Sequence, residues 1–89
     1  EESIIQLSNY PNPTNKNVTI EFLGKIEEIR SIKIFNIKGA SVNIPYSIMQ
    51  INSYLTKIIL NLDSIDVGTY FFSLTNLSDA KETLTIIKN

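Results

Sequence analysis

The carboxylates are the side chains of this sequence best able to do acid–base chemistry, because the sequence contains no histidine and no cysteine. The usual general base, thiol nucleophile and soft metal ligands are therefore missing. Nine acidic residues remain, and a glycosidase-like reaction would need two of them facing each other across a cleft. Their spacing singles out no such pair: Glu21 lies on the outward side of an alternating segment, and Glu27 and Glu28 are adjacent. We therefore predict surface charges, with no catalytic, cofactor-binding or metal site.

One loop carries two carboxylates close enough in sequence to suggest a cation. Asp63 and Asp66, with the backbone carbonyls that lead to Gly68, could supply oxygen ligands for calcium. The spacing lacks the alternating ligands and the closing glutamate of a helix–loop–helix calcium site. An Asx-type turn is the favoured interpretation, and calcium near Asp63 and Asp66 stays open as the alternative.

The aromatic residues raise the question of a sugar-stacking surface. Tyr70, Phe71 and Phe72 are consecutive in an alternating segment, where core packing on one face and cross-strand packing on the other is the usual arrangement. Phe35 and Phe71 remain as the candidates for exposed aromatic surface.

Composition and charge narrow the partners. The net charge is −1 and the eight basic residues are scattered, so the sequence lacks the basic stripe that a nucleic acid partner requires. No apolar run approaches the roughly 20 residues that span a bilayer, so we expect no membrane-spanning segment. The 89 residues suffice for one domain. Because the sequence starts at Glu1 without a signal peptide, we expect a processed piece of a longer protein.

Short alternating segments separated by turn residues predict an all-β fold. Apolar and polar residues alternate over residues 18–22, 58–62, 70–74 and 84–87, and residues 29–37 form a further apolar run. Six or seven strands at this spacing indicate an antiparallel sandwich or barrel, and we predict a two-sheet sandwich. The predicted core comprises Val18, Ile20, Phe22, Ile34, Leu60, Tyr70, Phe72, Leu74 and Leu84.

The connections between these segments are less regular. Lys38 and Gly39 suit a two-residue hairpin turn, with a positive φ at Gly39 and a strand continuing beyond it to residue 44. The stretch from Tyr46 to Tyr54 has no clean period and is expected to be a loop or a ragged edge strand. Residues 25–30 are too few for an independent helix and are expected to form a loop.

Two prolines separated by one residue mark the first connection. Pro11 and Pro13 lack backbone donors and hold the residues before them in extended conformations, so this segment can join neither a helix nor a central sheet ladder. Asn12 between them can hydrogen-bond its own backbone. The pattern predicts a stiff, extended corner with a fixed shape.

Three segments, taken in order, resemble the type A C-terminal sorting domain of the type IX secretion system. The first is YPNPTN at residues 10–15, followed by the strand VTIEF at 18–22. The second is IKIFNIKG at residues 32–39, and the third is GTYFFSL at 68–74, after which the sequence ends in IIKN at 86–89. The resemblance covers nearly the whole chain. It departs from the family at Lys16, where members often carry Gly, and in the long apolar stretch after Pro45.

This resemblance implies an Ig-like antiparallel β-sandwich of about seven strands, in which residues 1–89 form a single sorting domain excised from a larger secreted passenger. The implied partners are the outer-membrane type IX translocon, a sortase-like cysteine peptidase that removes the domain, and the passenger attached ahead of it. The passenger would cross the periplasm to the outer membrane and reach the cell surface or the medium. The implied role is an address without catalysis. The alternative is an Ig-like accessory, adhesive or carbohydrate-binding module of a larger surface protein.

The residues expected to carry the sorting signal lie in the matching segments. Gly39 and Gly68 would allow tight turns that other residues would strain. The Lys88→Glu substitution is expected to spare folding and to test recognition. The sorting candidates are Tyr10, Pro11, Asn12, Pro13, Gly39, Gly68, Tyr70, Ile86, Ile87 and Lys88.

Overall fold

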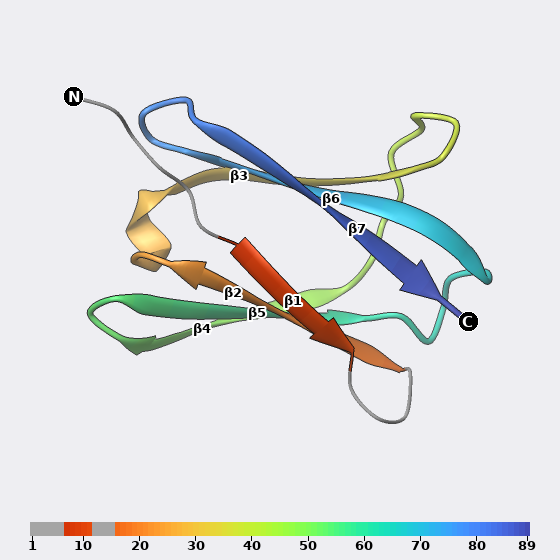
Figure 1. The fold of residues 1–89 in the computed structure, drawn as a ribbon, viewed down its shortest axis with the longest axis horizontal. Coiled ribbons are helices and arrows are strands. Elements are labelled where there is room, and N and C mark those ends of the chain that lie inside the picture. Colours follow the sequence, from red (N-terminus) through yellow and green to blue (C-terminus); the bar gives the residue numbers. More distant parts are fainter. Residues whose placement is uncertain (1–6, 12–15) are drawn as a thin grey trace.

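The computed structural model is a sandwich of two antiparallel β-sheets (Figure 1). It describes the backbone of residues 7–11 and 16–89, and the side chains of residues 16–89. One 3₁₀ turn, η1 (Ile26–Glu28), follows the second strand. The strands of the described residues are β1 (Leu7–Pro11), β2 (Asn17–Leu23), β3 (Ile29–Asn36), β4 (Tyr46–Asn52), β5 (Leu55–Asn61), β6 (Gly68–Asn76) and β7 (Lys81–Lys88).

These seven strands divide between two sheets. The four-stranded sheet has the order β1-β2-β5-β4, and the three-stranded sheet has the order β3-β6-β7. Every pairing between neighbours is antiparallel. The predicted all-β, Ig-like antiparallel sandwich of about seven strands is confirmed. The alternation of apolar and polar residues predicts these strands correctly because alternate side chains of each strand face the other sheet.

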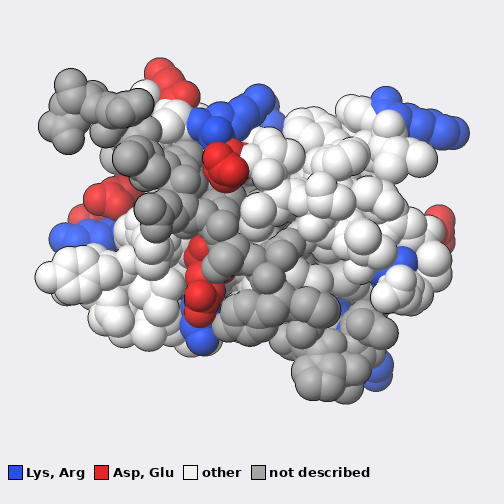
Figure 2. All heavy atoms as spheres, in the orientation of Figure 1, with Lys and Arg blue, Asp and Glu red and all other residues white. Residues whose placement is uncertain are grey.

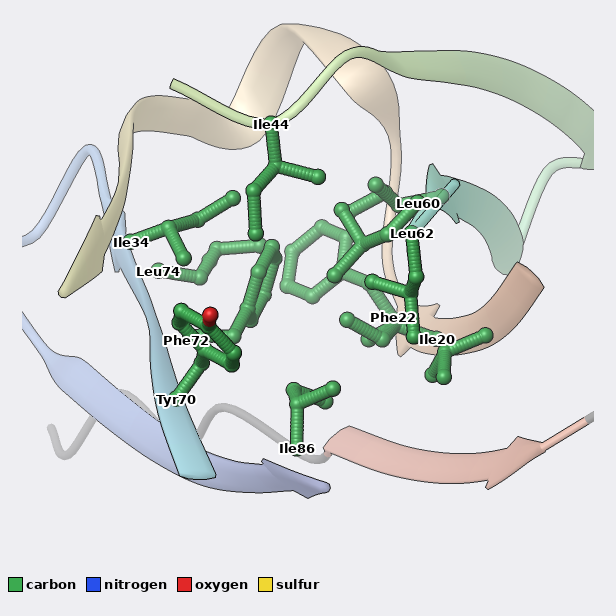
Figure 3. Packing of buried hydrophobic residues seen from close by; sticks show 12 residues of the cluster. Ile20, Phe22, Ile34, Ile44, Leu60, Leu62, Tyr70, Phe72, Leu74 and Ile86 are labelled. Carbon is green, nitrogen blue, oxygen red and sulfur yellow. The ribbon is translucent and has the colours of Figure 1, made fainter. Parts of the chain in front are cut away.

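The core lies between the two sheets and is built from the inward side of the strands (Figure 3). Every predicted core residue is buried except Leu84, which is only partly buried beside the cluster because it lies on the edge strand β7. Burial of each such side chain contributes roughly 1.5–3 kcal/mol. The core also contains Ile44, Ile58, Leu62 and Ile86, which the prediction omitted.

The turn after β3 differs from the predicted two-residue hairpin. Three residues separate Asn36 from Ala40, whose carbonyl accepts a 2.9 Å hydrogen bond from the Asn36 N–H. The strand predicted to continue to residue 44 is not formed: the chain makes a bridge from Ser41 to Phe35 and a hydrogen bond from the Val42 N–H to the Ile34 carbonyl, and then leaves the sheet. It leaves because it must cross to the four-stranded sheet, and on the way it buries Ile44 in the core. The positive φ predicted for Gly39 is confirmed at 84°.

The two segments without clear periodicity both have structure. The stretch from Tyr46 to Tyr54 contains β4, so of the two predicted alternatives the edge strand is correct. A register shift between Gln50 and Asn52 explains why apolar and polar residues do not alternate regularly there. The loop expected over residues 25–30 is instead η1 followed directly by the start of β3. The Glu28 carboxylate closes this turn by accepting a 3.0 Å hydrogen bond from the Lys25 N–H.

The first proline ends a strand. The sequence places Tyr10 and Pro11 in the connection after the first apolar residues, whereas the structure pairs them with Thr19 and Val18 as the last residues of β1. Pro11 fits there because β1 is an edge strand, where a missing N–H breaks no ladder bond on the open side. The predicted corner at Asn12 and Pro13 lies outside the described residues.

Candidate functional site: a recognition surface at one end of the sandwich

The segments that carry the sorting motifs lie far apart in sequence but meet at one end of the sandwich. In the four-stranded sheet, Pro11 pairs with Val18 at the end of β1. In the three-stranded sheet, β3 ends opposite Tyr70, and Gly68 pairs with Lys88. Figure 1 shows these strand ends in the same half of the molecule as the point marked C. We call this end the motif end.

The opposite end is formed by η1 and by the tight connections β4–β5 and β6–β7 (Figure 1). We call it the hairpin end. None of the described sorting candidates lies there, because the antiparallel pairing carries each of them to the other end of its strand.

The ammonium of Lys88 is the centre of the motif end. It donates hydrogen bonds to the backbone carbonyls of Leu62, at 2.5 Å, and Ile65, at 2.7 Å, with a longer one of 3.4 Å to Asp63. Lys88 closes β7 in the three-stranded sheet, whereas Leu62 directly follows β5 of the four-stranded sheet. This one side chain therefore ties the two sheets together at the motif end.

Tyr70 fixes the same loop from β6. Its side chain is buried, and its hydroxyl donates a 2.7 Å hydrogen bond to the carbonyl of Asp66. Gly68 stands between them with φ 156°, and a Cβ there would lie 4.0 Å from the Tyr70 ring. The loop of residues 62–67 is thus held at both ends, by Lys88 and by Tyr70, and its shape is set by the strands.

These contacts bear on calcium, which the sequence left open as the alternative to a turn in this loop. The carboxylates of Asp63 and Asp66 are exposed, and the carbonyls of the loop face the Lys88 ammonium instead. Carbonyls pointing at one centre satisfy an ammonium as they would a hard metal ion. Within residues 16–89 no three acidic side chains gather into a group able to hold a metal.

The same contacts overturn one expectation about Lys88. A glutamate there would place a carboxylate against three carbonyl oxygens, so Lys88→Glu would destabilise the fold. Lys88 is a structural tie whose ammonium is partly buried. The sequence could not reveal this role, because the three carbonyls lie 23 to 26 residues away along the chain.

The two isoleucines before Lys88 point in opposite directions. Ile86 pairs with Tyr70 and is 1% exposed in the core, whereas Ile87 pairs with Thr69 and is 60% exposed. Phe35 and Phe71, the expected exposed aromatics, lie opposite each other across β3 and β6 and are each partly buried. Ile87 is therefore the more accessible apolar side chain of the outer face.

The turn that contains Gly39 has a twin at the hairpin end. In residues 36–40 (NIKGA), the Asn36 Oδ1 accepts the N–H groups of Lys38 and Ala40. In residues 76–80 (NLSDA), the Asn76 Oδ1 accepts the N–H groups of Ser78 and Ala80 in the same way. The fourth residue has a positive φ in each turn, 84° at Gly39 and 67° at Asp79. Neither asparagine was predicted from the sequence, although an Asn four residues before an Ala was a readable signal.

The charged side chains of the described residues include one cross-strand ion pair in the four-stranded sheet. Glu21 faces outward and lies 3.9 Å from Lys57 in a cross-strand ion pair. On the face shown in Figure 2, uncharged side chains cover most of the described surface, and the lysines and arginines stand apart from one another. No helix in the described part of the chain is long and apolar enough to cross a bilayer.

Comparison with known proteins gives one match. A family model described as "Secretion system C-terminal sorting domain" matches residues 8–89. The matched region contains all three motif segments and every strand except the first residue of β1. No curated protein and no solved structure matches the chain.

Proposed function

Because the chain belongs to the family of secretion system C-terminal sorting domains, we propose that its motif end is the surface read by the type IX secretion machinery. Membership makes the domain a type IX sorting signal, which belongs to a secreted or cell-surface protein. The observation that supports the motif end is the convergence there of the described motif segments.

The proposed mechanism is recognition of a fixed shape. Lys88 and Tyr70 hold the loop of residues 62–67, and the Asn36 turn stands beside it at the same end. Around these ties the exposed side chains of Ile37, Val67 and Ile87 are available to a partner. Recognition by apolar side chains on a rigid frame loses little conformational entropy on binding.

The rest of the export route follows from this role. The passenger would precede the domain, cross the periplasm with it and meet the outer-membrane translocon. A sortase-like peptidase would then cut the domain from the passenger at the cell surface. In this sequence of steps the domain acts as an address and as a substrate, and another protein supplies the catalysis.

A reporter fusion tests the proposal. A reporter with an ordinary export signal carries this domain at its C-terminus, in a bacterium that has the type IX apparatus and in a matched strain without the translocon. We expect the reporter to become accessible to protease on intact cells only in the first strain. Retention of the intact fusion in the periplasm, while the translocon exports its own cargo, would contradict the assignment.

The twin turns provide a matched pair of variants for the same assay. Ile37 and Leu77 occupy the same position in the two turns and are 70% and 56% exposed. Neither side chain is part of the core, so replacement by serine leaves folding nearly unchanged. We expect Ile37→Ser at the motif end to lower export several-fold and Leu77→Ser at the hairpin end to leave it unchanged. Equal effects of the two variants would show that the motif end has no special role.

Removing residues 85–89 is a poorer test than these single substitutions. The deletion removes Ile86 from the core together with the Lys88 tie. Loss of export would then report unfolding, because these contacts are a large part of the stability of a domain this small. The single substitutions above separate recognition from folding.

A further inference from the structure

β4 is the most exposed strand among those whose side chains are described. Six of its seven residues are exposed, and only Ile48 is partly buried against the core. β4 pairs with β5 on one side and forms the edge of the four-stranded sheet on the other. Its sequence, YSIMQIN, contains no charged residue, proline or glycine. Edges of this kind readily accept another strand.

The other edges of the described sheets carry the usual protection. β1 ends in Pro11, and β7 carries Lys81, Glu82 and Lys88. The open side of β3 is covered by the chain that follows it, through the Ser41 bridge and a 2.9 Å hydrogen bond from the Val42 N–H to the Ile34 carbonyl. Charge, proline and coverage are the devices that keep edges from pairing. β4 carries neither charge nor proline, and η1 contacts it at Gln50, whose side-chain oxygen accepts a 2.8 Å hydrogen bond from the Ile26 N–H.

The hydrogen-bonding groups of β4 point outward in a regular pattern. The Asn61 N–H donates a 2.9 Å bond to the carbonyl of Pro45, the residue just before β4. In an antiparallel ladder, residues that bond to the neighbour alternate with residues that face away. Ser47 and Met49 therefore bond to β5, while the N–H and C=O groups of Tyr46, Ile48 and Gln50 face the open side. These three residues offer a short ladder to an added strand.

The surface beside this ladder is uncharged at the motif end. A shallow hollow of about 300 Å³ adjoins the start of β4 and is lined by Asn17, Pro45, Tyr46, Ser47, Ile59 and Asn61. A hollow of similar size beside the other end of β4, about 280 Å³, is lined in part by Lys25 and Glu27. An uncharged strand can bind to the first surface without removing water from any charged side chain that lines it.

We propose that β4 is the docking edge for an extended, uncharged segment of the type IX machinery, which adds to the four-stranded sheet as a further strand. This inference rests on the proposed function and identifies how one partner binds. Backbone hydrogen bonds supply the affinity in such pairing, and side chains in the adjoining hollow supply selectivity. The segment lies along residues 46–50, because the register shift after Gln50 interrupts the ladder.

A second copy of this chain fits the edge less well. A symmetric β4–β4 pair would engage only the five residues from Tyr46 to Gln50 in each copy, because the ladder is interrupted beyond them. A stable interface usually takes about 20–30 residues a side. A larger partner can add a strand and also cover the hollow and the motif end.

Two substitutions at Ile48 test the proposal. Ile48→Pro removes an N–H that faces away from β5, so it blocks the added strand and keeps the β4–β5 bonds. Ile48→Ala is its control, because it removes the same packing and keeps the N–H. We expect surface export of the reporter fusion to fall at least tenfold with Ile48→Pro and less than twofold with Ile48→Ala. Thermal unfolding of each purified domain checks that it is folded.

A second matched pair decides the question if Ile48→Pro does not fold. Met49→Glu places a charge on the edge beside Lys57, and Leu23→Glu places one on the interior strand β2 of the same sheet. The two positions are 50% and 54% exposed. We expect Met49→Glu to lower export at least tenfold and Leu23→Glu to change it less than twofold.

Three results separate the possible failures. Export of folded Ile48→Pro or Met49→Glu fusions at the parent level would overturn the β4 proposal while leaving the sorting function intact. A parent dimer in sedimentation velocity that Met49→Glu dissociates, with export unchanged, would assign β4 to a second copy and also overturn it. A parent fusion that is not exported at all contradicts the sorting function itself.

Discussion

The motif end and the hairpin end of the sandwich each hold one basic side chain against backbone carbonyls, and the two differ in what they join. At the motif end the Lys88 ammonium reaches three carbonyls of the loop that leads out of the other sheet. At the hairpin end Arg30 donates one 3.1 Å hydrogen bond to the Leu77 carbonyl and lies 3.2 Å from the Asp79 carboxylate. Arg30 and Asp79 are 52% and 75% exposed, so water competes for both groups.

This difference shows how a small sandwich can hold one end rigid. The contact of Arg30 joins β3 to the β6–β7 turn of the same sheet, whose strands the ladder already holds in register. The contact of Lys88 joins two sheets that otherwise meet through side-chain packing. The twin turns add a second contrast, because the same hydrogen bonds are made with Gly39 at one end and Asp79 at the other.

The largest effect should come from Lys88→Met, with Arg30→Met as its matched control at the hairpin end. Lys88→Met keeps most of the side-chain length and removes the charge, which leaves three carbonyls without their donor. We expect it to lower the free energy of unfolding by roughly 2–4 kcal/mol, because hydrogen bonds to charged groups are among the stronger ones. Arg30→Met should cost below about 1 kcal/mol, as exposed pairs do. Urea unfolding of the purified variants measures both.

An equal loss of stability in these two variants would break the comparison. It would show that the Lys88 ammonium is no better placed than an exposed pair. A salt series adds an independent check, because an exposed ion pair is screened and partly buried hydrogen bonds are screened less. In 1 M salt the screening length is only ~3 Å. The loss of unfolding free energy caused by Arg30→Met should therefore vanish there, while the loss caused by Lys88→Met should persist.

The next effect concerns the glycine of the motif-end turn. Among the described residues other than its two chain neighbours, none has an atom within 4 Å of the position a Cβ would take at Gly39, so a substitution there tests the backbone conformation without a clash. Gly39→Val should lower the free energy of unfolding by about 1–3 kcal/mol, because a β-branched residue is strained at φ 84°. Gly39→Asn should cost less than about 1 kcal/mol, because asparagine tolerates this region. Melting temperatures that match the parent for both variants would refute the positive φ.

Gly68→Val should act in the same direction for the same reason. The φ of 156° at Gly68 lies where residues with a side chain are rare, and the Tyr70 ring leaves room for a Cβ at 4.0 Å. We expect a loss of about 1–3 kcal/mol from backbone strain. If Gly68→Val unfolds at the parent's urea concentration, the strand start at Gly68 tolerates a side chain and the glycine has no conformational role.

Much of this architecture could be predicted because it depends on local pattern. The alternation of Tyr70 and Phe72 with Phe71 places the first two in the core wherever β6 pairs. The positive φ of Gly39 follows from the residue type and its place after an apolar run. The register shift between Gln50 and Asn52 does not, because it depends on how β4 pairs with β5.

The candidate site was predictable in its segments and unpredictable in its contacts. The motif segments can be recognised in the sequence. Their meeting at one end cannot, because it depends on the strand order, which pairs residues distant in sequence. Lys88 looks like a basic tip on a final strand until its carbonyl partners are known. The twin turn at Asn76 was legible in sequence, since residues 76–80 repeat the asparagine and alanine of residues 36–40.

The smallest expected effect separates the two contributions of Asp79 at the hairpin end. Asp79→Asn keeps a residue that tolerates the φ of 67° and removes the charge that faces Arg30. We expect a loss of about 0.2–1 kcal/mol in low salt, as for other exposed ion pairs. Combined with Arg30→Met, it should cost nothing further, because the pair is already broken. An added loss in the double variant would mean that the Asp79 carboxylate stabilises its turn through an interaction other than the Arg30 pair, and the two turns would then differ more than their shared hydrogen bonds indicate.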